Sequence, residues 1–189
     1  MLNESANLAG KLLLAMPGMG DPRFDGAVIF MCSHTDDGAM GLIINKPAQD
    51  IQFTDLLTQL DITPTDPSRD IRVHFGGPVE MGRGFVLHDQ SYVANDTTLK
   101  VGNDFAMTAT LDVVEDIAHG NGPDTSLLAL GYAGWGPGQL ETEIRANGWL
   151  TCDAPVELVF DDDNTCKWGK GLETLGINPL MLSAVAGDA

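Results

Sequence analysis

The chain has 189 residues, 43% of them apolar, and a mean hydropathy of zero, so one domain can bury a core without a disulfide or a metal. Its 27 acidic residues outnumber ten basic ones, which gives a net charge of −17. Because nucleic-acid binding needs Lys and Arg to neutralise phosphates, this charge disfavours direct binding to DNA, RNA or anionic membranes.

The cysteines and the N-terminus indicate the compartment. Cys32, Cys152 and Cys166 are an odd number without a close pair, which is typical of a reducing cytoplasm. Residues 1–10 form a polar leader that we expect to be loosely ordered, and the apolar run 12–16 is too short for a signal peptide or a membrane span. We therefore expect a cytoplasmic protein with a single domain, residues 1–189, and no membrane association.

The first third of the chain predicts three strands and a short helix. Apolar runs bounded by glycine or proline are typical of buried strands, and Phe53, Leu56, Leu57 and Leu60 repeat at helical spacing. The predicted elements are strands at 11–16, 26–33 and 39–45, a hairpin loop at 34–38, a helix at about 52–60 and a surface loop at 61–70.

The rest of the chain mixes strands and helices irregularly. The predicted strands are 71–75, 84–88, 99–101, 104–108, 126–132, 149–152 and 156–160. The predicted helices begin at Leu111, at Pro137, at Trp168 and at Pro179, and end near Gly120, Asn147, Leu175 and Val185. Strands that follow one another with helices at uneven intervals indicate an α+β fold rather than regular βαβ alternation.

The run Gly134-Trp135-Gly136-Pro137-Gly138 is the most particular motif of the chain. Glycines placed this closely permit positive φ or a close backbone approach, so we expect a tight strand-to-helix junction beside an exposed tryptophan. The helix start could instead bind an anion, but Glu141 would repel phosphate. A binding role for Trp135 remains the alternative.

A second glycine cluster surrounds Arg83. Gly76-Gly77-Pro78 and Gly82-Arg83-Gly84 have the composition of turns, and they do not match the dinucleotide-binding pattern GxGxxG. A nest of backbone N–H groups with Arg83 could alternatively hold a carboxylate or phosphate.

The histidines predict no metal or cofactor site. His34, His74, His88 and His119 lack the spacing of metal ligands. In Cys32-Ser33-His34, neighbours on a strand point to opposite faces, which argues against cooperation between Cys32 and Ser33, and Ser33 lacks the G-x-S-x-G pattern of a nucleophile. His74 and His88 could face each other across a hairpin. The acidic run 161–164 lacks the glycine and glutamate of an EF-hand and reads as a solvated turn.

Taken together, these residues closely resemble the YqgE/AlgH family of bacterial proteins. The matching blocks include Leu13-Leu14-Ala15-Met16-Pro17, residues 38–47, Gly76-Gly77-Pro78-Val79, residues 84–88 and residues 130–141. The resemblance covers nearly the whole chain and implies a single α+β domain, with a mixed or antiparallel sheet curled into a barrel-like core and several short helices. It implies no established activity, cofactor or catalytic residue. Some members are labelled transcriptional regulators, but this chain has no helix-turn-helix pattern.

Our first functional hypothesis is a non-enzymatic binding or regulatory protein. It would hold a small molecule or a protein partner on a surface made by Gly76, Gly77, Arg83, His88 and Trp135. This hypothesis predicts that Arg83 and Trp135 lie on the same face of the molecule. The oligomeric state stays open.

The second hypothesis is a hydrolase that uses His34 or His88 with a carboxylate. It requires one of these histidines to lie in a pocket beside Asp or Glu.

Overall fold

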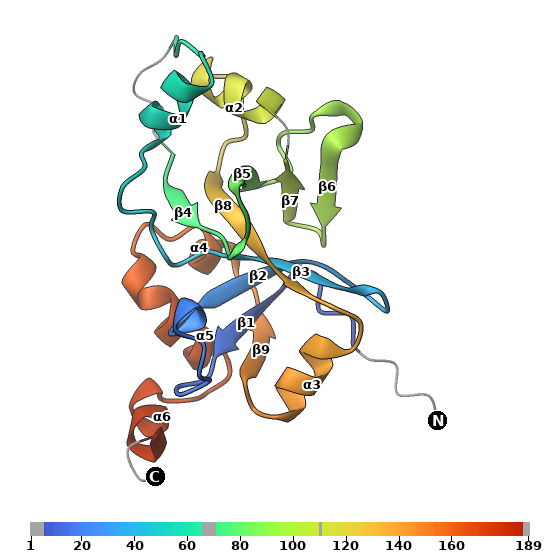
Figure 1. Cartoon of the computed structure of the whole chain (residues 1–189), viewed down its shortest axis with the longest axis vertical. Helices are drawn as coiled ribbons and strands as arrows, with labels where there is room; N and C mark the ends of the chain where they lie inside the picture. The colour runs from blue at the N-terminus through green and yellow to red at the C-terminus, as the bar shows by residue number, and fades with distance from the viewer. Residues whose placement is uncertain (1–5, 66–70, 110, 187–189) are drawn as a thin grey trace.

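The computed structural model describes residues 6–65, 71–109 and 111–186. The nine strands within these ranges form one strongly curled sheet, a half-barrel, with short helices on its outside and at its ends (Figure 1). The strand order is β6-β7-β5-β8-β3-β2-β1-β9, and β4 lies beside β8 outside this path. The α+β class that the sequence predicts is confirmed.

Sequence periodicity located most elements correctly. The strands are β1 (Lys11–Ala15), β2 (Val28–Thr35), β3 (Gly38–Ile43), β4 (Val73–Phe75), β5 (Val79–His88), β6 (Thr98–Val101), β7 (Phe105–Thr108), β8 (Ser126–Trp135) and β9 (Trp149–Asp153). The helices are α1 (Phe53–Gln59), α2 (Leu111–Ala118), α3 (Gln139–Arg145), α4 (Val156–Val159), α5 (Lys167–Thr174) and α6 (Pro179–Ala186).

Strand β8 connects the two halves of the sheet. Its first part pairs with β5 antiparallel and with β4 parallel, and its last residues, from Ala133 to Trp135, pair with β3. In Figure 1 this strand runs diagonally from the half that carries α2 to the loop before α3. The two glycine clusters of the sequence therefore meet along one strand.

The strands of the lower half are buried on both faces. Leu12 and Leu14 belong to the cluster that α5 covers through Leu172, whereas Leu13 belongs to the cluster that α3 covers through Leu140. Successive side chains of a strand point to opposite faces, so one apolar run supplies both clusters. A third cluster lies under α1 and α2 and includes Phe53, Leu57, Val113 and Ile117.

Two predictions about the second half are wrong. The predicted strand 156–160 is the one-turn helix α4. Pro155, extended at φ −62° and ψ 136°, is its N-cap, and the chain turns directly after it. A short apolar run does not distinguish a strand from a buried helical turn. Pro137 does not occupy the first turn of α3, since Gly138 (φ 72°) is the N-cap.

Three further predictions need correction. His74 and His88 do not face each other across a hairpin, because β4 and β5 each pair with β8. The hairpin loop predicted at 34–38 is shorter, since β2 runs to Thr35 and β3 starts at Gly38. Trp135 is only 7% exposed, so it is not an exposed tryptophan.

Some expectations concern segments only partly described. Residues 1–5 of the predicted leader and 66–70 of the predicted surface loop lie outside the described residues. Within the leader, Leu8 N–H donates to the His34 ring and Gly10 N–H donates to Met31 O. No helix in the described part of the chain is long and apolar enough to span a bilayer.

Candidate functional site

Gly76 and Gly77 lie against the backbone of β8 rather than around a ligand. A Cβ on Gly76 would lie 2.3 Å from Gly131 O, and one on Gly77 would lie 2.1 Å from the Tyr132 carbonyl carbon. The Gly76 N–H donates to Leu130 O at 2.8 Å and is therefore not available to an anion. These glycines permit the close approach of two backbones.

Arg83 and Trp135 do line one hollow, of about 670 Å³, between β3, β5 and β8. Both side chains already have partners, however. Trp135 Nε1 donates to Glu143 Oε2 at 2.9 Å, while Arg83 lies 3.6 Å from Glu80 and over the Phe85 ring. The two residues share a face as expected. The Trp135 N–H is engaged, and the contact of Arg83 with Glu80 is an exposed pair at the surface, so among the described residues this hollow has no buried cation.

His88 is separate from that hollow and fully buried. Its Nδ1–H donates to Asp89 O at 2.6 Å, and its Nε2 accepts from the Thr108 hydroxyl at 2.8 Å. Burial lowers the pKa of His88, so the ring is neutral and both nitrogens are engaged. It holds β5 to β7, and the nearby Asp89 carboxylate accepts from Ser91 and Thr125 rather than from the ring.

His34 lies beside a carboxylate but has no free ring nitrogen. Its Nδ1 accepts the Leu8 N–H at 3.1 Å, which places the proton on Nε2, and Nε2–H donates to Glu141 Oε1 at 2.6 Å. A general base needs an available lone pair, and this ring has none. The geometry gives the hydrolase hypothesis no support.

Glu143 fixes α3 to the sheet. Its Oε2 accepts from the indole N–H groups of Trp135 (2.9 Å) and Trp149 (2.8 Å), and its Oε1 accepts from Gln139 (3.1 Å). This carboxylate lines a hollow of about 720 Å³ over residues 16–24. Because both oxygens are engaged, Glu143 acts as a structural group.

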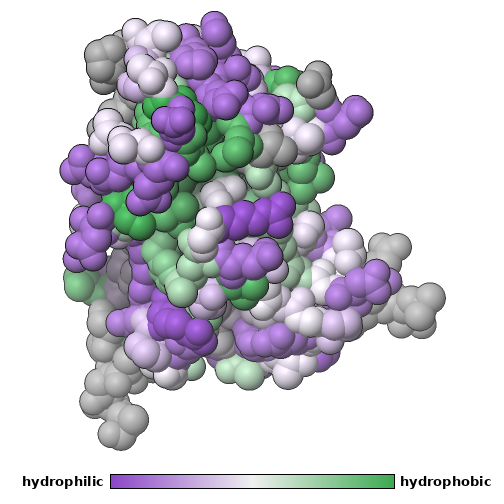
Figure 2. Space-filling model, turned by 45° about the horizontal axis from the view of Figure 1, so that its top comes forward, coloured by the Kyte–Doolittle hydropathy of each residue, from purple (hydrophilic) through white to green (hydrophobic). Residues whose placement is uncertain are grey.

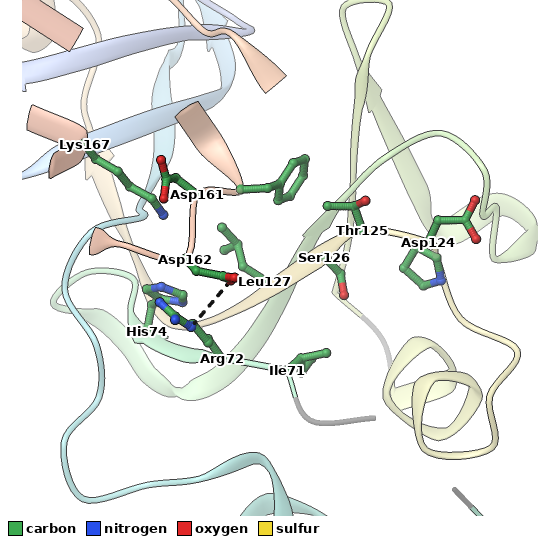
Figure 3. Close-up of a pocket in the computed structure, with 12 residues that line it drawn as sticks. Ile71, Arg72, His74, Asp124, Thr125, Ser126, Leu127, Asp161, Asp162 and Lys167 are labelled. Atoms are coloured by element: carbon green, nitrogen blue, oxygen red, sulfur yellow. Dashed lines mark ion pairs between the residues drawn. The ribbon is translucent and has the colours of Figure 1, made fainter. Parts of the chain in front are cut away.

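A different pocket, of about 320 Å³, combines buried and exposed charge (Figure 3). It lies where β4 and the start of β8 meet the segment that leads into α5. Its charged and polar lining includes Arg72, His74, Ser126, Asp161, Asp162 and Lys167. Figure 3 shows Lys167 and Arg72 extending from opposite sides toward the space beside His74.

Lys167 is the unusual residue of this pocket. It begins α5, yet only 1% of it is exposed, and its Nζ donates to Ile44 O at 2.7 Å. An ammonium group has three N–H donors. Among the described residues, Ile44 O is the one acceptor at hydrogen-bond distance from Lys167 Nζ. Burial lowers the pKa of Lys167 to about 8, so it is mostly charged at neutral pH.

Arg72 stands at the mouth of the pocket. Half of its side chain is exposed, and its Nε lies 3.9 Å from Asp162, whose side chain is 93% exposed. A contact of this length at the surface contributes little to stability. The guanidinium can therefore exchange Asp162 for another anion.

His74 and Asp161 form the walls between the two cations. His74 Nδ1–H donates to Leu128 O at 3.3 Å, and its Nε2 accepts from the Asn164 amide at 3.2 Å. Burial lowers the pKa of His74, so it stays neutral. Asp161 bonds to Lys170, which lowers the pKa of Asp161 to about 2 and keeps it ionised.

Known proteins are similar to this chain over nearly its whole length. A model of the domain family described as AlgH-like matches residues 12–180. The chain belongs to the AlgH-like family.

Its relatives include UPF0301 proteins of Cereibacter sphaeroides (54% identity over 97% of this chain and 100% of the relative) and Ruegeria pomeroyi (58% over 97% and 100%). The solution structure of the AlgH protein from Pseudomonas aeruginosa has a TM-score of 0.79 and 40% identity, with full coverage of both chains. A crystal structure of a protein from Corynebacterium diphtheriae, at 22% identity and a TM-score of 0.72 over 93% of this chain and 90% of that one, shares the fold.

In this AlgH-like protein the described residues hold no group of three His, Cys, Asp or Glu side chains able to bind a metal. The pocket of Lys167 was missed by sequence reasoning. A lone Lys before Trp168 is typical of an exposed helix start, and only the tertiary fold shows that Ile44 and His74 cover it. Arg72 carries no signal in the sequence either.

Proposed function

We propose that this AlgH-like protein is a non-enzymatic binding protein for a small oxyanion, a carboxylate or a phosphate, held between Lys167 and Arg72. The observation that carries the proposal is the buried ammonium of Lys167 on the wall of a 320 Å³ pocket. Burying an ammonium group destabilises the fold. The nearby carboxylates of Asp161 and Asp162 offset part of that cost without forming an ion pair with Lys167, and a bound anion would offset more of it.

The pocket supports binding rather than chemistry. Its histidine has both ring nitrogens engaged. Of the three carboxylates that the described residues place on its wall (Asp124, Asp161 and Asp162), Asp161 is bonded to Lys170 and Asp162 lies near Arg72. The volume matches a small metabolite. Ser126 supplies a hydroxyl on the wall opposite the cations.

We further infer that the protein works in the cytoplasm and does not bind DNA directly. All three cysteines are described and unpaired, as in a reducing compartment. The net charge of −17 opposes contact with a phosphate backbone. Any regulatory role would then pass through the bound ligand or a protein partner.

A calorimetric titration tests the proposal. Sodium phosphate and sodium succinate are titrated into the full chain, with sodium chloride at matched ionic strength as a blank. Lys167→Met keeps the volume and removes the charge, and we expect it to weaken binding at least about tenfold. Arg72→Gln should weaken binding by a similar factor.

Arg83→Gln is the matched control, since its exposure (55%) is close to that of Arg72 (51%) while it lines the other hollow. It should leave binding unchanged. If Arg83→Gln abolishes binding and Lys167→Met does not, the ligand lies in the hollow of Arg83 and Trp135, and the proposal is wrong. Equal binding to the chain and to Lys167→Met would also reject it.

A further inference from the structure

An apolar groove lies at the opposite end of the molecule from α6, between α1 and α2 (Figure 1). Its apolar lining is Leu56, Leu60, Leu111, Val114, Leu128 and Leu130. The groove has a volume of about 270 Å³. We call it the α1–α2 groove.

Exposed apolar side chains border this groove. Leu111 is 56% exposed, Leu60 is 40% exposed, and Met81 on the adjoining bulge of β5 is 59% exposed. Figure 2, which brings this end forward, shows hydrophobic side chains gathered there among hydrophilic ones. Single exposed leucines are ordinary, but several around one groove are typical of an interaction site.

Among the described residues, the paired strands below the groove leave no free edge, and residues 80–83 of β5 form a bulge outside the ladder. Strand β5 pairs with both β7 and β8, and β8 pairs on its other side with β4. An occupant therefore gains contacts from side chains and not by adding a strand. This favours a helix, which can lay its apolar face into a groove between two helices.

The charges beside the groove determine the kind of helix. Helix α1, which lines the groove, carries Asp55 and is followed by Asp61. The acidic residues of α2 (Asp112, Glu115 and Asp116) line a separate hollow beside Tyr92, and neither helix contains Lys or Arg. Arg83, on the groove wall, is paired with Glu80. A second copy of this chain, also at −17, would be repelled. A cationic partner would be attracted.

We propose that the α1–α2 groove docks a short amphipathic helix of a partner protein, with leucine-type side chains on one face and Lys or Arg on its flanks. This inference is independent of the anion pocket, because the two hollows share no lining residue. The apolar face fills the groove, and the flanking cations are attracted by the acidic residues of α1 and by the acidic hollow on the outer side of α2.

The test uses two fluorescent peptides of about 14 residues, roughly four turns of helix. One repeats Leu at the i, i+3, i+4, i+7 spacing with Lys between, and the other has the same composition in scrambled order. Anisotropy is measured with the full chain at about 0.15 M salt. We expect the patterned peptide to bind at least about tenfold more tightly than the scrambled one.

Leu111→Gln and Leu60→Gln should each weaken binding of the patterned peptide about tenfold, because each removes an apolar contact of the groove. Leu180→Gln is the control, since Leu180 is 76% exposed on α6 at the far end of the molecule. Equal binding of both peptides would mean that charge alone attracts them. No binding of the patterned peptide, or binding unaffected by the groove variants, would equally overturn the inference.

Discussion

The Gly77→Ala variant is expected to lose its stable fold. An alanine Cβ would lie 2.1 Å from the carbonyl carbon of Tyr132 and 2.4 Å from Ala133 N, so β8 would have to move away from the loop before β5. Gly77 also has a φ of +154°. We expect a cost of about 4 kcal/mol or more, measured by urea unfolding followed by circular dichroism.

Gly18→Ala separates the two causes of that cost. Gly18 also has a positive φ (78°), but a Cβ there would meet nothing within 4 Å. The strain of a left-handed alanine alone should cost about 1 kcal/mol. If Gly77→Ala is no worse than Gly18→Ala, the close approach of the two backbones is not what requires glycine.

The Glu143→Leu variant is expected to lose about 3–5 kcal/mol of stability. The carboxylate is the hydrogen-bond acceptor of two buried indole N–H groups, those of Trp135 and Trp149. Without it both donors stay unsatisfied, and α3 loses its polar attachment to the sheet. Urea unfolding followed by tryptophan fluorescence measures the loss of stability.

Glu141→Leu provides the comparison on the same helix. Glu141 accepts from one side-chain donor, His34, and is 29% exposed, so its loss should cost less than about 2 kcal/mol. If the two variants lose the same free energy of unfolding, the two indole hydrogen bonds of Glu143 do not stabilise the fold as we infer.

Much of the fold could be predicted because the strands are strongly apolar and bounded by glycine and proline. Residues 11–16 and 26–33 show this clearly, since β1 and β2 are buried on both faces. The one-turn helix after Pro155 could not be predicted, because four residues are too few to show a helical period. The pairing of β4 with β8 could not be predicted either, because the two strands are more than fifty residues apart and no local sequence pattern identifies such a partner.

The sites were less predictable than the strands. The glycine motifs led us to expect Arg83 and Trp135 on one face, and the two residues do line one hollow. Arg83 lies on β5 and Trp135 ends β8, and these two strands are paired. They did not show that Glu143 already engages the Trp135 indole. The burial of Lys167 arises from segments far away in the chain, Ile44 among them, so its sequence neighbours carry no trace of it.

The pKa of Lys167 is the most direct measure of the anion pocket. Lysine labelled with ¹³C at Cε, with Lys167→Met for assignment, is titrated by NMR with and without sodium phosphate. Burial disfavours the ammonium and a bound anion favours it, so the pKa should lie at about 8 in the free protein and rise when phosphate is present. A Lys167 that titrates like the exposed lysines, or whose pKa phosphate leaves unchanged, would contradict the account.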